Sequence, residues 1–356
     1  MNRKRQLVGL AIVITLLAGI AFVLPELLRH QNSGSSNLRA GSSLRFAQLP
    51  ITYSAVTFLA DANGYYRLPS LNYRSFSVPA GPDVVTALRG AGPTSADAGG
   101  IAVTPVVTMI GAGDQPVVLA TTLTSNSQAK LITFQGLGIL KDPATLKGKR
   151  IGVVKNTIGE IYLSRLLHKG GLNDTDVTIV NGRPADLRSL LVRGDIDAAV
   201  IWDPFIIQAE RQYEGLLHEG RVRDRGKPVV FVDPTLYTLA FNIVTTRAKL
   251  AVRRVQLTQM LEGTIKAEAF IRAHPKEAQH ELEQWLGLKS GDLDDFMATT
   301  DFHVYLNVPK MEQWMQEELA WLAKEQPGTV AVMPHDFSSF VDASLLKSID
   351  PSRVTQ

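Results

Sequence analysis

The sequence contains no cysteine among its 356 residues. This absence excludes a disulfide framework, a lipid anchor carried on cysteine, and any metal motif built from thiolates. Histidine is also sparse, and its seven positions are scattered without the spacing that metal ligands require. We therefore expect neither a metal site nor a cofactor in this chain. The histidines are His30, His168, His218, His274, His280, His303 and His335.

Several motifs that are typical of catalysis or of phosphate binding are missing as well. There is no Gly-x-Ser-x-Gly turn, no Gly-x-x-x-x-Gly-Lys loop and no Gly-x-Gly-x-x-Gly sequence. His280 and Glu281 stand together but lack the second histidine of a zinc protease. These absences favour a protein that binds without catalysing a reaction.

The excess of positive charge is confined to the beginning of the chain. The formal net charge is +3, and Arg3, Lys4, Arg5 and Arg29 set against Glu26 account for all of it. The remainder carries equal numbers of acidic and basic residues, so it has no field suited to a phosphate backbone. We expect no nucleic-acid partner.

The first 28 residues have the pattern of an export signal. Basic residues precede an uncharged apolar run from Leu7 to Leu24, which Pro25 ends. The run is long enough to span a bilayer, and no clear Ala-x-Ala cleavage site follows it. Residues 1–28 are thus either a cleaved signal peptide or a retained membrane anchor. In both cases the basic end stays in the cytoplasm and the rest of the chain lies outside, in the periplasm or on the outer face of the cytoplasmic membrane.

The remaining sequence predicts a linker followed by two α/β lobes. Residues 29–43 are rich in Asn, Ser and Gly, which is typical of a flexible linker. Short apolar runs then alternate with helical patterns, which indicates mainly parallel sheets. After about Thr246 the pattern is helical only. We expect 44–130 to form the first part of lobe 1, 131–235 to form lobe 2, and 236–356 to complete lobe 1 with C-terminal helices.

Three predicted turns from strand to helix carry small or hydroxyl residues. They begin at Pro50, at Ala80 and at Lys155. Such turns present free N–H groups and the positive end of a helix dipole, which suits an anionic group. Any one of these turns is equally explained by the needs of the fold, because α/β proteins require small residues there.

Taken in order, longer blocks resemble a known family. The most specific are Leu146–Val153, which follows Asp142-Pro143, and Gly194–Pro204; Gly81–Leu88 and Gln48–Pro50 also match. The chain resembles the periplasmic binding proteins for nitrate, aliphatic sulfonates, taurine and thiamine precursors. The resemblance runs from Arg45 to about Leu286.

The resemblance implies the type II periplasmic-binding-protein fold, an α/β fold with a ligand cleft between two lobes and a C-terminal helical cap. Two hinge segments should cross near 122–136 and 229–236. The ligand-binding residues implied are Pro50, Thr52, Tyr53, Gly81, Pro82, Gly99, Gly100, Thr157, Ile158, Gly159, Glu160, Trp202 and Asp203.

Four features of these positions leave choices open. Gly99 and Gly100 stand where the family commonly has a bulky residue, and Asn156 stands where a glycine often opens the turn. Trp202 is either a wall over the ligand or a core residue. Asp203 contacts the ligand, caps the helix that follows, or does both, and a paired role for Glu160 and Asp203 would favour a zwitterionic ligand.

The function implied is that of a monomeric, extracytoplasmic solute-binding protein of an ABC importer, which delivers its ligand to a permease in the inner membrane. The solute expected is small and anionic or zwitterionic, of the sulfonate, taurine or nitrate type. One alternative is an enzyme on the same fold, of the kind used in thiamine-precursor or menaquinone biosynthesis. Another is a ligand-sensing module, which would need an additional signalling part.

Overall fold

The computed structural model describes residues 43–68, 70–92 and 94–356, and its residues 43–356 form one compact unit. The predicted signal or anchor in 1–28 and nearly all of the predicted linker in 29–43 lie outside the described residues. Within the described part, no helix is both long and apolar enough to cross a bilayer.

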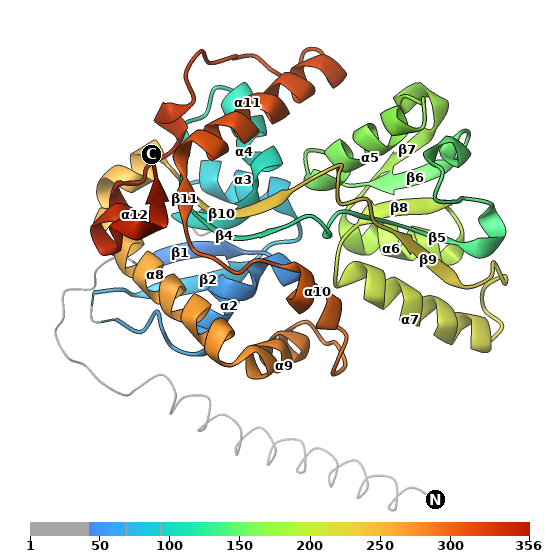
Figure 1. The fold of residues 1–356 in the computed structure, drawn as a ribbon, viewed down its shortest axis with the longest axis horizontal. Helices are drawn as coiled ribbons and strands as arrows, with labels where there is room; N and C mark the ends of the chain where they lie inside the picture. The colour runs from blue at the N-terminus through green and yellow to red at the C-terminus, as the bar shows by residue number, and fades with distance from the viewer. Residues whose placement is uncertain (1–42, 69, 93) are drawn as a thin grey trace, which may run out of the picture. The chain divides into compact units, whose positions relative to one another are not determined.

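The first of two five-stranded sheets has the order β2-β1-β3-β10-β4 (Figure 1). Strands β2 and β3 both run parallel to β1, whereas β10 is antiparallel to β3 and to β4. We call the elements built on this sheet lobe 1. Its strands are β1 (Leu44–Gln48), β2 (Tyr73–Ser77), β3 (Ala98–Ala102), β4 (Pro116–Ser125) and β10 (Leu239–Thr246).

The second sheet has the order β7-β6-β8-β5-β9 and repeats the same design. Strand β6 is parallel to β7 and β8, and β5 is antiparallel to β8 and β9. We call the elements on this sheet lobe 2. Its strands are β5 (Lys130–Phe134), β6 (Arg150–Val153), β7 (Thr178–Asn181), β8 (Ala198–Ile201) and β9 (Pro228–Phe231).

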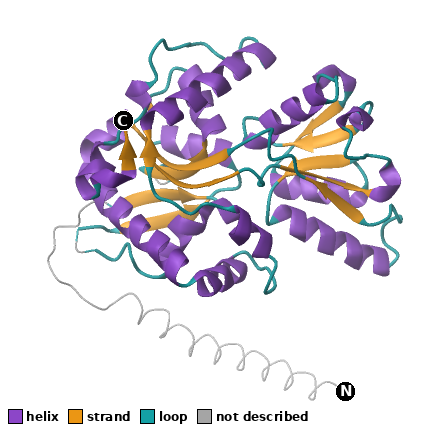
Figure 2. Ribbon diagram, in the orientation of Figure 1, coloured by secondary structure: helices purple, strands orange, loops and turns teal. Residues whose placement is uncertain are grey.

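Each sheet has helices packed around it, as Figure 2 shows in purple against orange strands. Lobe 1 carries η1 (Thr52–Ser54), α2 (Ala55–Ala62), α3 (Gly81–Arg89) and α4 (Val103–Gly111). Lobe 2 carries α5 (Ile158–Lys169), α6 (Pro184–Arg193), α7 (Phe205–His218) and the short turns η2 (Gln135–Leu137), η3 (Pro143–Leu146) and η4 (Asp174–Asp176).

The sheets are more mixed than the sequence predicted. Each contains one antiparallel strand, β10 in lobe 1 and β5 in lobe 2. Both strands are the first that the chain forms on entering a sheet from the other lobe. It goes from β4 to β5 and from β9 to β10 without an intervening helix. The two passages occupy residues 126–129 and 232–238.

The region after β10 forms a helical layer on lobe 1. The long helix α8 (Arg247–Ala273) packs on α2 and α12 (Ser344–Ile349), and α11 (Val308–Glu325) packs on α4. The other elements are α9 (Pro275–Trp285), α10 (Asp294–Thr299), β11 (Leu306–Asn307), η5 (Ser338–Phe340), η6 (Pro351–Arg353) and β12 (Val354–Thr355).

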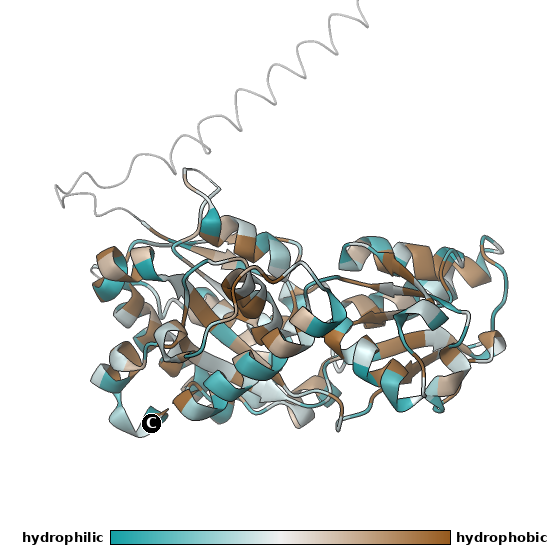
Figure 3. Cartoon of the chain, turned by 90° about the horizontal axis from the view of Figure 1, so that it is seen from above, coloured by the Kyte–Doolittle hydropathy of each residue, from teal (hydrophilic) through white to brown (hydrophobic). Residues whose placement is uncertain are grey.

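The core follows from the hydrophobic pattern of these elements. Strands such as β8, with the sequence Ala-Ala-Val-Ile, are buried on both faces because helices cover both faces of the sheet. Helices bury one face only, so brown and teal positions alternate along them in Figure 3. The predicted lobe boundaries, at 130–131 and 235–236, fall at the start of β5 and between β9 and β10, and they stay a prediction.

Candidate functional site

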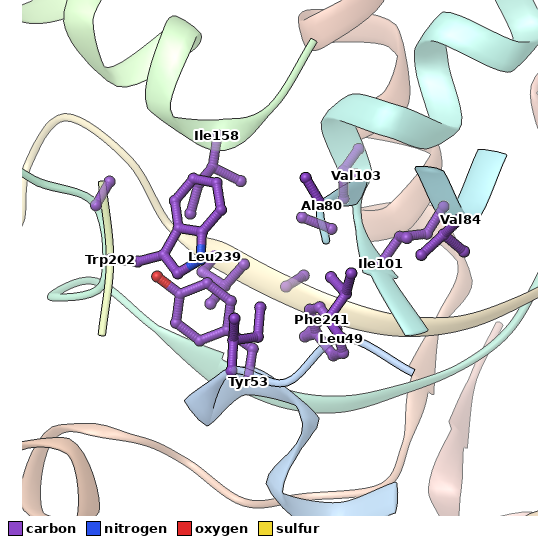
Figure 4. Close-up of a cluster of buried hydrophobic side chains, with 14 of the residues drawn as sticks. Leu49, Tyr53, Ala80, Val84, Ile101, Val103, Ile158, Trp202, Leu239 and Phe241 are labelled. Carbon is purple, nitrogen blue, oxygen red and sulfur yellow. The ribbon is translucent and has the colours of Figure 1, made fainter. Parts of the chain in front are cut away.

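A small cavity lies where ends of the two sheets meet. Its volume is about 20 Å³, which is close to the smallest space that holds one water molecule. Lobe 1, including its strand β10, supplies most of the wall, and lobe 2 supplies three residues. The lining residues are Leu49, Ile51, Tyr53, Gly81, Ala102, Pro105, Thr157, Ile158, Trp202 and Phe241. Figure 4 shows the rings of Tyr53 and Trp202 next to each other, with Ile158 above and Leu239 and Phe241 beside them.

The first predicted turn forms one wall and ties the lobes together. Thr52 and Tyr53 are buried in the 3-10 helix η1, directly after β1, and Pro50 before them is half-buried. The Thr52 hydroxyl donates to the backbone carbonyl of Asp203 in lobe 2 at 3.3 Å. The Tyr53 hydroxyl donates to the carbonyl of Gln128 in the first passage at 2.8 Å.

The environment of Tyr53 keeps its hydroxyl protonated. Burial, reinforced by the negative charge of Asp203, raises the pKa of Tyr53 well above its ordinary value. Its ring centroid lies 6.3 Å from that of Trp202 and 6.0 Å from that of Phe241. Tyr53 therefore acts as a fixed hydrogen-bond donor and as one face of the apolar wall.

The second turn reaches the cavity through Gly81. A side chain at Gly81 would meet the ring of Pro105 at 2.7 Å, so glycine lets the start of α3 approach α4. Pro82 is half-buried in the first turn of α3 and is not part of the lining. The Asp83 carboxylate accepts a hydrogen bond from the Ala80 N–H at 3.1 Å, so a negative charge of the chain itself already occupies this helix start.

The third turn brings Thr157 and Ile158 to the cavity, whereas Glu160 is not one of the lining residues. Asn156 has a φ of 59°, a left-handed conformation that asparagine tolerates better than most residues. This explains why asparagine stands where glycine was expected. The Glu160 carboxylate accepts from the Asn156 N–H at 2.7 Å, and burial raises its pKa. The Thr157 hydroxyl accepts from the N–H of Gly159 and caps α5.

Trp202 and Asp203 follow β8, and the structure gives them different roles. Trp202 is only 3% exposed and lines the cavity at the junction of the lobes. Its indole Nε1 finds no acceptor among the described residues. The Asp203 carboxylate lies 2.6 Å from Nζ of Lys130 at the start of β5. Asp203 does not cap the next helix, because α7 begins after Pro204 without a side-chain cap.

Three predicted glycines serve close packing. The space beside Gly99 in β3 is filled by Val84, and the space beside Gly100 is filled by the Phe241 ring. A side chain on Gly159 would meet the carbonyl of Val200 at 3.1 Å, which holds α5 close to β8. None of these glycines is among the lining residues of the cavity.

Sequence reasoning missed part of the lining, namely Leu49, Ile51, Ala102, Pro105 and Phe241. Leu49 and Ile51 stand directly before and after the predicted Pro50 in the sequence. This adjacency is the signal that points to them as lining residues. Phe241 lies in β10, and only the pairing of β10 with β3 places its ring at the cavity. Hydrophobicity alone does not separate a core residue from a residue of the ligand wall.

Further contacts join the lobes outside the cavity. Arg183, before α6, lies 3.3 Å from Asp83 of α3. Arg211 of α7 pairs with Asp292 of lobe 1. The Trp321 indole of α11 donates to the hydroxyl of Ser164 in α5 at 3.1 Å. Elsewhere in the described ranges, no cluster of three or more His, Asp or Glu side chains is placed to hold a metal ion.

Relatives with curated names match about half of this chain. A protein of Brucella abortus named as a binding protein is 27% identical over 183 residues, which are 48% of this chain and 54% of that protein. An Escherichia coli protein named for aliphatic sulfonate binding is 29% identical over 157 residues, 44% of this chain and 46% of that one. A yeast hydroxymethylpyrimidine phosphate synthase from Saccharomyces cerevisiae is 29% identical over 151 residues, 42% of this chain and 43% of that enzyme. The chain thus spans about half the length of the curated relatives it matches.

Solved structures match nearly the whole described fold. The alkanesulfonate-binding protein of Xanthomonas axonopodis pv. citri, bound to MOPS, has a TM-score of 0.68 at 21% identity and covers 86% of this chain and 100% of its own. The periplasmic nitrate-binding protein of Synechocystis PCC 6803 has a TM-score of 0.67 at 12% identity, with coverages of 88% and 89%. The predicted α/β periplasmic-binding-protein fold is confirmed.

A family model gives the relationship in sequence. The model described as NMT1/THI5 like matches residues 51–278, a stretch that contains η1, both passages between the lobes, and Trp202. This stretch is more than half of the chain, and the protein therefore belongs to the NMT1/THI5-like family.

Proposed function

We propose that this protein is the extracytoplasmic solute-binding component of an ABC importer. The observation that carries the proposal is the cavity at the junction of the lobes. Both sheets direct strand ends toward it, which is where ligands bind in open α/β folds. Two passages connect the lobes, so a solute held there contacts both sides at once.

Reversible closure of the lobes is the second part of the proposal. Few direct polar contacts hold the two lobes together, and they include the Thr52 hydroxyl and the exposed Arg183–Asp83 pair. Exposed ion pairs contribute about 0–1 kcal/mol, so they allow opening at a small free-energy cost. A solute that contacts both walls gains its full favourable binding free energy only in the closed form. Binding therefore stabilises the closed form.

Location and partners follow from the same proposal. The basic and apolar pattern of residues 1–28 supports export, with the segment either cleaved or retained as an anchor. The relatives named as binding proteins support delivery of the solute to a permease in the inner membrane. We propose that a single copy performs the capture, because one chain supplies both walls of the cavity.

An enzyme on this fold is the second candidate, and the yeast synthase among the relatives is the observation that favours it. The cavity argues for binding alone. The hydroxyl of Tyr53 donates to a carbonyl, and one carboxylate oxygen of Asp203 is paired with Lys130 while the other, Oδ1, has no hydrogen-bond partner among the described residues. Nothing in that arrangement activates a nucleophile or positions a general base.

The test is to isolate the full chain from its native host without denaturation and to identify bound small molecules by mass spectrometry. The protein is then stripped, and the identified compound is added back while calorimetry follows binding. We expect one compound to bind at one site per chain and to be recovered unchanged.

Two results would contradict the proposal. Conversion of the recovered compound by the stripped protein would establish the enzyme instead. Failure to recover or bind any compound from native extracts, with an unchanged melting temperature in every fraction, would remove the solute-binding function.

A saturating solute should stabilise the fold by about 2.7 kcal/mol at a hundred times its Kd.

A further inference from the structure

The lining of the cavity specifies a kind of solute. Resting on the proposed function, we infer that the ligand is an uncharged, mainly apolar ring compound that presents one hydrogen-bond acceptor to Trp202. Sulfonate and nitrate, for which relatives are named, are anions. The chemistry of this cavity differs from what an anion requires, in four respects.

The first respect is the composition of the wall. Among the described residues that line the cavity there is no Arg, Lys or His, and the side chains are aliphatic or aromatic apart from Thr157 and the Tyr53 hydroxyl. That hydroxyl already donates to Gln128. An anion moved from water into such a place loses its hydration without a compensating partner, which is strongly unfavourable.

The second respect is the occupation of the helix starts. The positive end of α3 carries Asp83, whose carboxylate accepts the Ala80 N–H. At α5, Thr157 caps the Gly159 N–H, and Glu160 accepts the Asn156 N–H. The chain's own acidic side chains therefore take the place that an anionic ligand would occupy at these two ends.

The third respect is the pairing of the nearest opposite charges. Lys130 and Asp203 lie 2.6 Å apart, and their side chains are only 15% and 6% exposed. The pair is neutral overall, so Lys130 offers no unpaired charge to an anion. The other carboxylate oxygen of Asp203, Oδ1, is buried without a hydrogen-bond partner among the described residues, and it can accept a hydrogen bond from an N–H or O–H group of the solute.

The fourth respect is a buried donor that lacks an acceptor. The indole Nε1 of Trp202 is enclosed, and within the described chain no oxygen accepts its hydrogen. Figure 4 shows the nitrogen on the edge of the ring beside Leu239, inside the apolar cluster. Leaving such a donor unsatisfied is unfavourable, and a carbonyl or ether oxygen on the ligand would satisfy it.

The size of the cavity sets how the solute enters. About 20 Å³ holds no ring, so Trp202 and Ile158 of lobe 2 must move away from Tyr53 and Phe241 of lobe 1. Opening at the two passages achieves this movement. The ring of the solute then takes the position between the walls that Trp202 and Tyr53 now share, and stacks on their aromatic faces.

The experiment uses four probes that share one ring. Acetophenone has a neutral carbonyl acceptor, benzoate and benzenesulfonate carry an anionic group, and toluene has no acceptor. Binding of each to the full chain is measured by calorimetry at neutral pH. We expect acetophenone to bind at least tenfold more tightly than either anion, and about fivefold more tightly than toluene.

Variants separate the hydrogen bond from the packing. Trp202→Phe keeps an aromatic wall and removes the N–H, so acetophenone should lose its advantage over toluene. Trp285→Phe is the matched control, because Trp285 stacks on Phe58 outside the cavity and should leave all four affinities unchanged.

The outcomes distinguish this inference from the proposed function. Tighter binding of benzoate or benzenesulfonate than of acetophenone would overturn the ligand class and leave solute capture intact. Absence of binding by acetophenone would also overturn it, whatever native extracts contain. Recovery of an anionic compound from the native protein would have the same meaning.

Discussion

At the scale of single residues, buried polar groups around the junction are the most sensitive positions. Lys130 and Asp203 form an ion pair that is almost fully buried. Glu318 of α11 is buried as well and accepts a hydrogen bond from the Tyr237 hydroxyl at 2.9 Å. Removal of one partner from such a pair destabilises the folded protein, because the other partner stays buried without a compensating group.

Lys130→Met should lower the free energy of unfolding by about 3 kcal/mol, since it leaves the Asp203 carboxylate buried and unpaired. Urea denaturation measures the change. The double variant Lys130→Met with Asp203→Asn removes both charges and should recover most of the loss. Equal stability of the single and double variants would show that the pair is not buried as described.

Glu318 should make stability depend on pH. Burial raises its pKa from 4.5 to about 7, with Tyr237 and Arg165 acting in the opposite direction. The folded protein thus keeps this proton up to about pH 7, whereas the unfolded chain releases it near pH 4.5. The contribution to stability is fully present below pH 4.5 and is lost as the pH rises through 7.

Glu318→Gln removes that titration while it keeps an oxygen for Tyr237. Relative to the wild type, the variant should gain about 3 kcal/mol of unfolding free energy between pH 4.5 and pH 8. Chemical denaturation of both proteins across that range measures the difference. A constant difference would mean that Glu318 ionises normally in the folded state.

At the scale of elements, glycines fix how closely helices approach strands. Gly99 in β3 faces Val84 of α3, and a methyl group there would lie 2.5 Å from a Val84 methyl and 3.3 Å from the Ala47 carbonyl. Strand β3 is buried throughout, so neither neighbour moves easily. The helix start that holds Gly81 is positioned by this contact.

Gly99→Ala should therefore destabilise the fold by about 1–3 kcal/mol through overpacking. Gly215→Ala is the control, because Gly215 is exposed in α7 with no atom near the added methyl group. That control should gain about 0.5–1 kcal/mol from helix propensity. Thermal unfolding of both variants measures these changes. A melting temperature of Gly99→Ala equal to that of the wild type would contradict the close approach of α3 to β3.

Helix α11 acts as a bridge, because it packs on α4 in lobe 1 and bonds to α5 in lobe 2 through Trp321 and Ser164. Trp321→Phe removes this bond and should weaken solute binding about two- to tenfold by favouring the open form. Trp285→Phe is the control, because Trp285 stacks on Phe58 within lobe 1 and should leave affinity unchanged. Similar affinities for the Trp321 variant and the wild type would show that the contact from α11 does not stabilise the closed form of the lobes.

The elements were largely predictable, but their contacts were not. Short apolar runs in the sequence mark β1, β6 and β8, because strands buried on both faces are nearly continuous apolar stretches. The buried face of α8 does not follow a strict spacing of four residues, since Ala269 is exposed while Ala267 and Ile271 are buried. A spacing of four departs from the 3.6-residue period over several turns.

At the scale of the whole molecule, the sequence pointed to the turns of the cavity and not to its chemistry. Thr157, Ile158, Tyr53, Gly81 and Trp202 line it as predicted positions. Pairing between distant segments decided the rest, because β10 brings Phe241 and β5 brings Lys130 to Asp203. Long-range contacts of this kind leave no local pattern in the sequence.

If the two lobes close on a solute, the distance between them must shorten when the solute binds. The chain lacks cysteine, so Thr86→Cys in α3 and Glu214→Cys in α7 provide two exposed labelling sites in different lobes. Paired spin labels report the distance distribution in the full chain, with and without the compound recovered from the native protein. We expect a broad distribution of distances that becomes narrower and shifts to shorter distances when the compound saturates the site. An identical distribution in both samples, at saturation shown by calorimetry, would contradict it.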